Sequence, residues 1–283
     1  MQCKLPKIHF IMPSGGAKGS FQAGFIYQLF THYSELFKIY QVDGISIGAI
    51  NGLSIFSKDM EKLKDIWFSI KSKEDIFCSL SNSYFFNDFF SYLYSFTNMS
   101  VFDNKKLIQL INNYDIDYSS IHKYNCGLVN LDKGIIEYIN GTNENLIQYV
   151  VGSSSPWILS PPCNINNTMY TDGGLLELYP SKYIKKSNAD IIVIVGYDEH
   201  YNKLEGTIGD NIFTYLERII EISMYNNIKT NINTIKQLID THNIVLIPNK
   251  MNIDILNFSQ EDIIQNFNYG SQAVLPFIEK YLL

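Results

Sequence analysis

Val42-Asp43-Gly44-Ile45-Ser46-Ile47-Gly48-Ala49-Ile50-Asn51-Gly52 is the stretch that decides the fold of this 283-residue chain. An apolar run precedes the serine and a helix-competent run follows it, so the pattern G-x-S-x-G stands where a strand turns sharply into a helix. Glycine on both sides, at Gly44 and Gly48, removes Cβ clashes where the chain doubles back. Ser46 would then begin the helix, whose positive end favours developing negative charge. The stretch predicts a nucleophilic serine, and the alternative is a glycine-rich turn with an incidental serine.

A second glycine-rich loop lies about thirty residues earlier, between an apolar run at 8–12 and a helical pattern that begins near residue 20. It departs from the phosphate-binding loop of nucleoside triphosphatases, because Gly19 is followed by Ser20 and not by a Lys-Ser or Lys-Thr pair. It departs from the dinucleotide fingerprint because its glycines are spaced GGxxG. What remains is a row of backbone N–H groups at a helix start, which binds anions. An oxyanion hole and a phosphate site both fit, and the second strand-loop-helix element favours the oxyanion hole. The candidate residues are Gly15, Gly16, Ala17, Lys18 and Gly19.

Asp172 is the candidate base, because a carboxylate within hydrogen-bond reach of a serine hydroxyl can accept its proton directly. It follows a short strand-like run at 167–171 and precedes Gly173 and Gly174, which free the backbone beside the acid. Asp-Gly is also common turn chemistry, so the motif taken alone favours an exposed turn.

Apolar runs of strand length alternate with helical patterns along the chain, which indicates an α/β fold. The expected elements are strands at 8–12, 39–42, 167–171, 191–195 and 243–247, a hairpin at 126–139, and helices at 143–152, 208–240 and 260–281. We expect a single domain over residues 1–283, with a core at about 8–200 and a C-terminal helical extension at about 207–283 packed on it.

Composition excludes several function classes. The net charge is −6 and no basic run stands out, so binding to nucleic acid through phosphate contacts is not expected. The four cysteines are scattered without zinc-ligand spacing, and free thiols in a reducing compartment are expected. The first residues lack the apolar core of a signal peptide, and no apolar run reaches the ~20 residues of a membrane span. A cytoplasmic protein is therefore expected.

The three motifs GGAKGSFQAG (15–24), VDGISIGAING (42–52) and YTDGG (170–174) occur in an order that resembles the patatin-like phospholipase family. Gly15, Gly16 and Gly19 match its glycine loop, and Ser46 matches its nucleophile. Asp172 matches the second member of its catalytic pair. The small-residue run 152–162, the segment 103–110 and the run 257–274 extend the resemblance to about residues 8–280. Two positions depart from it, since Lys18 stands where many members carry arginine and Ile47 where a small residue is common.

This resemblance implies a three-layer α/β/α fold with a mostly parallel central sheet. It also implies a Ser46–Asp172 dyad without histidine, an oxyanion hole in the glycine loop, and no cofactor or metal. The implied activity is lipid acyl hydrolysis, with a phospholipid or another acyl lipid as substrate.

The aromatic segment 84–96, YFFNDFFSYLYSF, has apolar residues on every helical face. A buried core helix is one interpretation. The other is an acyl-chain channel or a surface that enters the lipid interface, with Phe85, Phe86 and Phe89 contacting substrate beside Ile47. Because the chain is acidic, any peripheral contact with a membrane would have to be mainly apolar.

Two other functions remain open from the residues alone. An α/β-hydrolase esterase would use Ser46 and Asp172 with His200 or His242, and the chain order Ser, Asp, His suits it. A protein without catalysis would use the two glycine loops to bind a phosphorylated ligand.

Overall fold

The computed structural model describes residues 4–72, 75–76, 78–79, 102–156, 160–197, 212–251, 253–255 and 257–283. The strands are β1 (Lys7–Met12), β2 (Lys38–Ile45), β3 (Cys78–Ser79), β4 (Phe102–Asp103), β5 (Tyr124–Asn130), β6 (Ile135–Asn140), β7 (Cys163–Ile165), β8 (Thr168–Asp172), β9 (Ile191–Tyr197) and β10 (Ile244–Pro248). The helices are α1 (Gly19–His32), α2 (Ile47–Ser54), α3 (Glu61–Ser69), α5 (Lys105–Asn112), α6 (Leu146–Ser153), α7 (Ser181–Ile184), α8 (Ile212–Ile239), α9 (Gln260–Gln272) and α10 (Val274–Tyr281).

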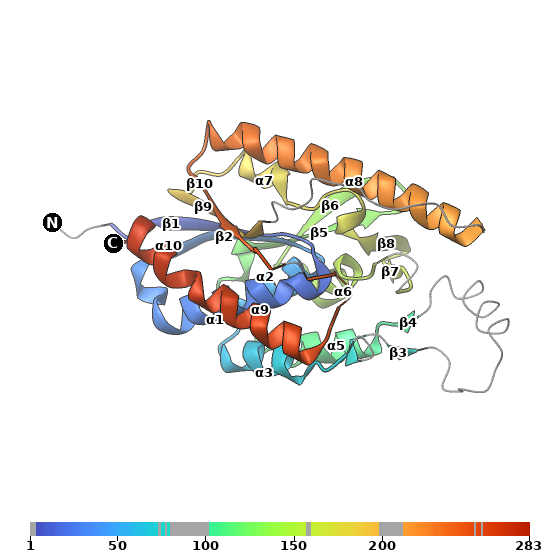
Figure 1. Cartoon of the computed structure of the whole chain (residues 1–283), viewed down its shortest axis with the longest axis horizontal. Coiled ribbons are helices and arrows are strands. Elements are labelled where there is room, and N and C mark those ends of the chain that lie inside the picture. Colours follow the sequence, from blue (N-terminus) through green and yellow to red (C-terminus); the bar gives the residue numbers. More distant parts are fainter. Residues whose placement is uncertain are drawn as a thin grey trace.

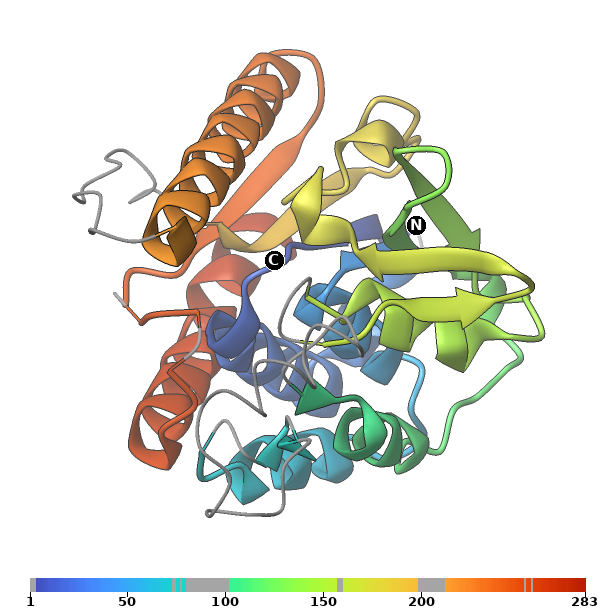
Figure 2. The same cartoon turned by 90° about the vertical axis from the view of Figure 1, so that its right-hand side faces the viewer.

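A central sheet of eight strands organises the molecule, in the order β10-β9-β1-β2-β5-β8-β7, with β6 also paired to β5. The five strands from β10 to β5 are parallel, whereas β6, β7 and β8 join in antiparallel pairs. The parallel strands therefore end at one edge of the sheet, which faces the viewer in Figure 2. Ligands of open α/β sheets bind beyond this carboxyl edge.

Helices cover both faces of the sheet. Figure 1 shows α7 and α8 above it and α1, α9 and α10 below it. The strands explain this arrangement, because successive side chains of β1 alternate between the two layers. Ile8, Phe10 and Met12 join the large core between the sheet and the layer of α1 and α9. Ile11 joins the smaller core between the sheet and the layer of α7 and α8. The expected three-layer α/β/α fold with a mostly parallel sheet is confirmed.

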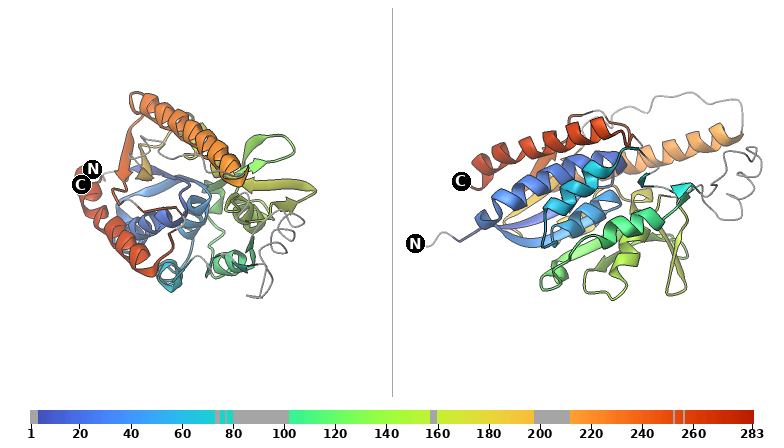
Figure 3. Two further views of the ribbon diagram at one scale, coloured as in Figure 1. Left: turned by 45° about the vertical axis from the view of Figure 1, so that its right-hand side comes forward. Right: turned by 90° about the horizontal axis from the view of Figure 1, so that it is seen from below.

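The helices α1 and α9 pack with their backbones nearly touching, although they lie at opposite ends of the chain (Figure 3). A Cβ atom added to Gly24 of α1 would lie 1.8 Å from the carbonyl oxygen of Phe267, and one added to Gly270 of α9 would lie 2.0 Å from that of Phe21. Only glycine permits this approach. The helix α1 therefore packs directly against α9.

Most of the elements expected from the sequence are present, with boundaries shifted by a few residues. The hairpin forms as β5 and β6, and the closing helix divides into α9 and α10. The strand expected at 243–247, within the C-terminal segment, forms as β10 and joins the central sheet beside β9. The aromatic run 84–96, with Phe85, Phe86 and Phe89, lies outside the described residues.

Candidate active site

Ser46 occupies a strained turn between β2 and α2. Its φ and ψ are 57° and −129°, a conformation that L-residues adopt rarely and that costs about 1–3 kcal/mol. The two glycines of the motif have a steric reason for being there. A Cβ at Gly44 would lie 2.3 Å from the carbonyl oxygen of Gly48, and one at Gly48 would lie 2.1 Å from that of Met12. The sharp turn predicted from the motif is therefore present.

The hydroxyl of Ser46 donates a hydrogen bond to Oδ2 of Asp172 over 2.6 Å. The sheet brings these residues together across 126 positions of sequence, because β2 and β8 pair with consecutive stretches of β5, whose other edge pairs with β6. Ile45 pairs with Gly127 of β5, and the neighbouring Leu128 pairs with Asp172. The second carboxylate oxygen, Oδ1, accepts the amide N–H of Gly174 over 2.7 Å. A base is thus held beside the serine in fixed orientation.

The carboxyl group of Asp172 is buried, with 5% of the residue exposed. Burial raises the pKa of Asp172 to about 7, against the lowering effect of the hydrogen bonds from Ser46 and Gly174. Desolvation dominates because it disfavours the charged form of the group. A carboxylate with this pKa is a much stronger base than an exposed aspartate, and it changes protonation state near neutral pH.

The first glycine loop joins β1 to α1 and lies against a glycine two residues after each member of this pair. On one side, a Cβ at Gly48 would lie 2.5 Å from the carbonyl oxygen of Pro13. On the other, a Cβ at Gly174 would lie 2.7 Å from Oγ of Ser14. The loop therefore lines the space beside the serine.

The five candidate amides of this loop differ in how they are used. Ala17 donates to the carbonyl oxygen of Ile255 over 2.9 Å, and Lys18 donates to that of Gly15 over 3.1 Å. The amide of Gly19 bonds back to the carbonyls of Gly16 and Ala17. No acceptor lies within reach of the Gly15 and Gly16 amides among the residues that the structure describes. These two N–H groups are the ones left for an anionic atom.

Ile47 packs inward against the glycine loop. A Cβ at Gly19 would lie 2.3 Å from Cγ1 of Ile47, so the isoleucine fills the space that the small residue leaves. The contact gives a reason for the third loop glycine that the motif alone did not. It also makes the side chain part of the wall between the two glycine elements.

A run of three serines at the end of α6 contacts the backbone of the pair. Ser153 Oγ accepts the amide N–H of Ser46 over 3.0 Å, and Ser154 Oγ donates to the carbonyl oxygen of Ser46 over 2.8 Å. The carbonyl oxygen of Ser155 accepts the amide N–H of Asp172 over 3.0 Å. Sequence reasoning noted the small-residue run but assigned no contact to it, because the partner serine is 107 residues away.

No described histidine bonds to either member of the pair. His242 stands just before β10, at the far edge of the sheet, and its ring bonds to the adjacent Thr241. His9 is fully buried, and its Nε2 lies 2.6 Å from Oδ2 of Asp43, which ties β1 to β2. His200 lies outside the described residues. The residues considered for a histidine triad are thus not assembled in the described part of the chain.

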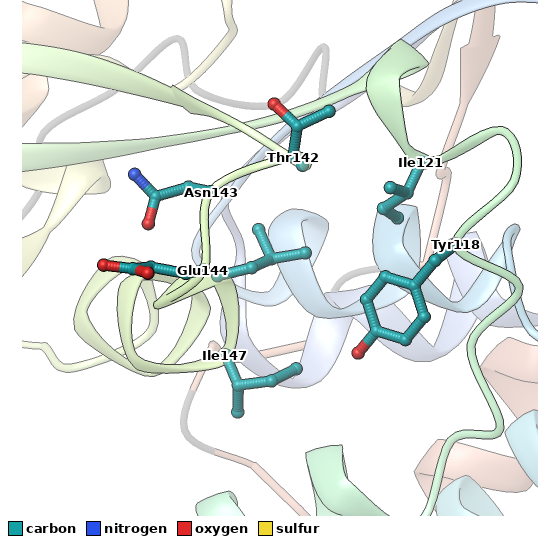
Figure 4. A pocket seen from close by; sticks show the side chains of 8 residues that line it. Tyr118, Ile121, Thr142, Asn143, Glu144 and Ile147 are labelled. Carbon is teal, nitrogen blue, oxygen red and sulfur yellow. The ribbon is translucent and has the colours of Figure 1, made fainter.

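A cavity of about 470 Å³ lies at the opposite end of the sheet. Tyr118 and Ile121 form one side of it (Figure 4). The other lining residues are Gly141, Thr142, Asn143, Glu144, Leu146 and Ile147. Both sides adjoin the start of β5, whereas Ser46 follows the end of β2, which runs parallel to β5. The cavity is therefore separate from the Ser46–Asp172 pair.

The described part of the chain contains neither a metal-ligand cluster nor a membrane-spanning helix. Among those residues, no cluster of three or more His, Cys, Asp or Glu side chains has the arrangement of a metal site. Within the same residues, none of the helices combines the length and apolar character that crossing a bilayer requires.

Comparison with known proteins gives one family and one fold. A family model described as patatin-like phospholipase matches residues 10–183, which is more than half of the chain. The curated proteins contain no significant match. Among solved structures, the chain is similar to that of VipD from Legionella pneumophila, with a TM-score of 0.52 and 13% sequence identity. That alignment covers 99% of this chain and 67% of VipD, and at this identity it speaks for the fold alone.

Proposed function

The chain belongs to the patatin-like phospholipase family, and from that premise we propose that it cleaves fatty-acyl esters of lipids with Ser46 as nucleophile and Asp172 as base. The family implies lipid acyl hydrolysis in general. The observation that carries the specific proposal is the 2.6 Å hydrogen bond between the Ser46 hydroxyl and a buried carboxylate whose pKa is about 7.

In the first half of the reaction, Ser46 Oγ attacks the acyl carbonyl carbon while its proton passes to Oδ2 of Asp172. The tetrahedral intermediate collapses, the ester C–O bond breaks, and the leaving alkoxide takes the proton from Asp172. The products are a fatty-acyl ester on Ser46 and a free alcohol. Because the carboxyl group titrates near pH 7, it can both accept and return the proton at neutral pH.

In the second half, a water molecule attacks the acyl-enzyme and gives its proton to Asp172. The acyl–oxygen bond to Ser46 breaks, the serine recovers a proton, and a fatty acid leaves. One carboxylate thus serves both halves without a histidine. The hydrogen bond from Gly174 to Oδ1 keeps Oδ2 directed at the hydroxyl.

The developing oxyanion is proposed to bind the amides of Gly15 and Gly16. Two observations support this assignment, namely the position of the loop beside Ser46 and the lack of another acceptor for these amides in the described chain. A single donor of this kind contributes about 2.7–4 kcal/mol to stabilisation of the transition state. The start of α2, directly after Ser46, adds its dipole in the same sense.

The proposed substrates are phospholipids or acylglycerols, approached at a lipid surface through apolar contact. Leu176 follows the Asp172 motif and is 37% exposed, while Ile255 stands beside the glycine loop and is 36% exposed. Both are apolar side chains next to the site on an acidic protein, which suits contact with acyl chains. We further propose that residues 1–283 act as a single catalytic domain, because β10 and α9 complete the sheet and the layer below it.

The test compares the wild-type protein with Ser46→Ala and Asp172→Asn across a panel of phospholipids and acylglycerols, with fatty-acid release as the readout. Both variants should lose hydrolysis while keeping the wild-type circular dichroism spectrum. His242→Ala should retain full activity, and loss of activity there would favour the α/β-hydrolase alternative. A fluorophosphonate probe should label wild-type protein at Ser46 alone. Retained turnover in either site variant would refute the assignment.

A further inference from the structure

Two side chains from another part of the chain form hydrogen bonds with the strained backbone of Ser46, one to its N–H and one to its carbonyl oxygen. Its N–H points at the hydroxyl oxygen of Ser153, 3.0 Å away, and its carbonyl oxygen receives the hydroxyl of Ser154 over 2.8 Å. Ser153 is fully buried and Ser154 is 7% exposed. Ser153 is the last residue of α6 and Ser154 is its C-cap, so both are remote in sequence from the turn that they contact.

The Ser153 hydroxyl has two partners, because it acts both as a hydrogen-bond acceptor and as a donor. It accepts from Ser46 and donates to the carbonyl oxygen of Gly127 in β5 over 2.6 Å. Gly127 itself pairs with Ile45, the residue before the nucleophile. The hydroxyl therefore joins the turn to the strand beneath it. Removing it would leave one donor and one acceptor buried without a partner.

The same short segment also holds the base. The carbonyl oxygen of Ser155 accepts the amide N–H of Asp172 over 3.0 Å and the hydroxyl of Thr171 over 2.9 Å. Three consecutive residues thus fix the backbones of both members of the pair. One short segment of chain therefore contacts both the nucleophile and the base.

From these contacts we infer that Ser153 and Ser154 are positioning residues, which hold the Ser46 turn in its strained conformation and so keep Oγ within reach of Asp172. The inference rests on the proposed function of Ser46. A residue at φ 57° relaxes toward negative φ unless its surroundings prevent it, and that rotation carries the side chain away from its partner. The hydroxyls of the two serines bond to the peptide groups on either side of this residue.

The experiment measures kcat and KM for ester hydrolysis in Ser153→Ala and Ser154→Ala. Each variant should lose about tenfold in kcat with KM within about twofold of wild type, because the loss falls on alignment of the reacting atoms. The double variant should lose about 100-fold. Ser154→Thr keeps the hydroxyl and should stay within about threefold of wild type.

Ser54→Ala is the matched control. Ser54 is also fully buried, and its hydroxyl donates to the carbonyl oxygen of Asn51 over 2.7 Å, within α2 and away from the turn. It should lower the thermal midpoint about as much as the two α6 variants and leave kcat unchanged. Equal loss of kcat in Ser54→Ala, or wild-type kcat in both α6 variants, would overturn the inference.

Hydrogen exchange separates failure of this inference from failure of the proposed function. The Ser46 amide should exchange at least about tenfold faster in Ser153→Ala than in wild type, whether or not the protein hydrolyses lipid. Unchanged exchange would show that Ser153 does not hold the turn. Absence of hydrolysis in wild-type protein, together with faster exchange in Ser153→Ala, would refute the proposed function and leave the positioning role standing.

Discussion

Replacing Asp172 with asparagine should make the protein more stable while it abolishes hydrolysis. Asparagine has the same shape as aspartate, so its oxygen can still accept the Gly174 amide and its nitrogen can donate toward Ser46. What the change removes is a carboxyl group that ionises in a buried place. The variant therefore isolates the free-energy cost of keeping a base at this position.

The size of that cost follows from the pKa of the carboxyl group. Burial raises the pKa of Asp172 to about 7, whereas the ordinary aspartate value, which applies in the unfolded chain, is 3.8. At 1.36 kcal/mol per pKa unit, the ionised carboxylate costs the native state about 4 kcal/mol. Because the pKa is higher in the folded chain than in the unfolded chain, the carboxyl group imposes no cost on the native state below pH 3.8, where it is protonated in both. Stability is lost progressively as pH rises to 7 and the unfolded chain ionises more readily than the folded one.

Urea unfolding of wild type and Asp172→Asn at pH 5 and pH 8 measures this cost directly. The difference in unfolding free energy between the two proteins should grow by about 3 kcal/mol from pH 5 to pH 8, in favour of the asparagine variant. Comparing two variants at each pH cancels the titration of groups that both share. Asp132→Asn, at an exposed aspartate in the turn after β5, is the control and should track wild type at both pH values.

A difference that is the same at both pH values would refute this reasoning, since it would mean that Asp172 titrates alike in the folded and unfolded chains. The same result would remove the physical basis for a single carboxylate acting as base. A variant that is stabilised as expected but still hydrolyses lipid would instead place the base elsewhere.

Four other outcomes follow from the geometry. The kcat/KM of the wild-type enzyme should rise with pH around a midpoint near 7, as the Asp172 carboxyl ionises, and a midpoint near 4 in a pH–rate profile would contradict it. Ser46→Gly should exceed Ser46→Ala in unfolding free energy by about 1 kcal/mol, because glycine adopts φ 57° without strain, and urea titration of both variants measures the difference. Gly24→Ala should cost about 3 kcal/mol, because its Cβ would meet the Phe267 carbonyl at 1.8 Å. Gly134→Ala has open space around it but a φ of 65°, so it should cost only about 1 kcal/mol in the same assay.

The local parts of this site were predictable because each depends on neighbouring residues. Gly44 and Gly48 indicate a sharp turn, and Ser46 has the strained φ that such a turn requires. Apolar runs of strand length likewise predicted the strands on which the site is built. Such signals act over a few residues, where steric rules leave few choices.

The long-range parts were not predictable from the residues themselves. Asp172 stood in a sequence pattern more typical of an exposed turn, and only the family resemblance paired it with Ser46. The roles of Ser153 and Ser154, and the contact of Ile255 with the glycine loop, left no trace in composition or spacing. Serine and isoleucine are common, and which of them meet depends on the order of strands in the sheet.

The packing of α1 against α9 also has a consequence for the order in which the site forms during synthesis. Synthesis runs from the N-terminus, so the first glycine loop and the nucleophile turn leave the ribosome long before residues 260–272. Until α9 follows, α1 has no partner for its glycine face, and Ala17 has no Ile255 carbonyl to anchor it. A nascent chain therefore contains Ser46 and Asp172 before it contains the residues that pack against α1 and the first glycine loop, and these contacts form only after α9 has been synthesised.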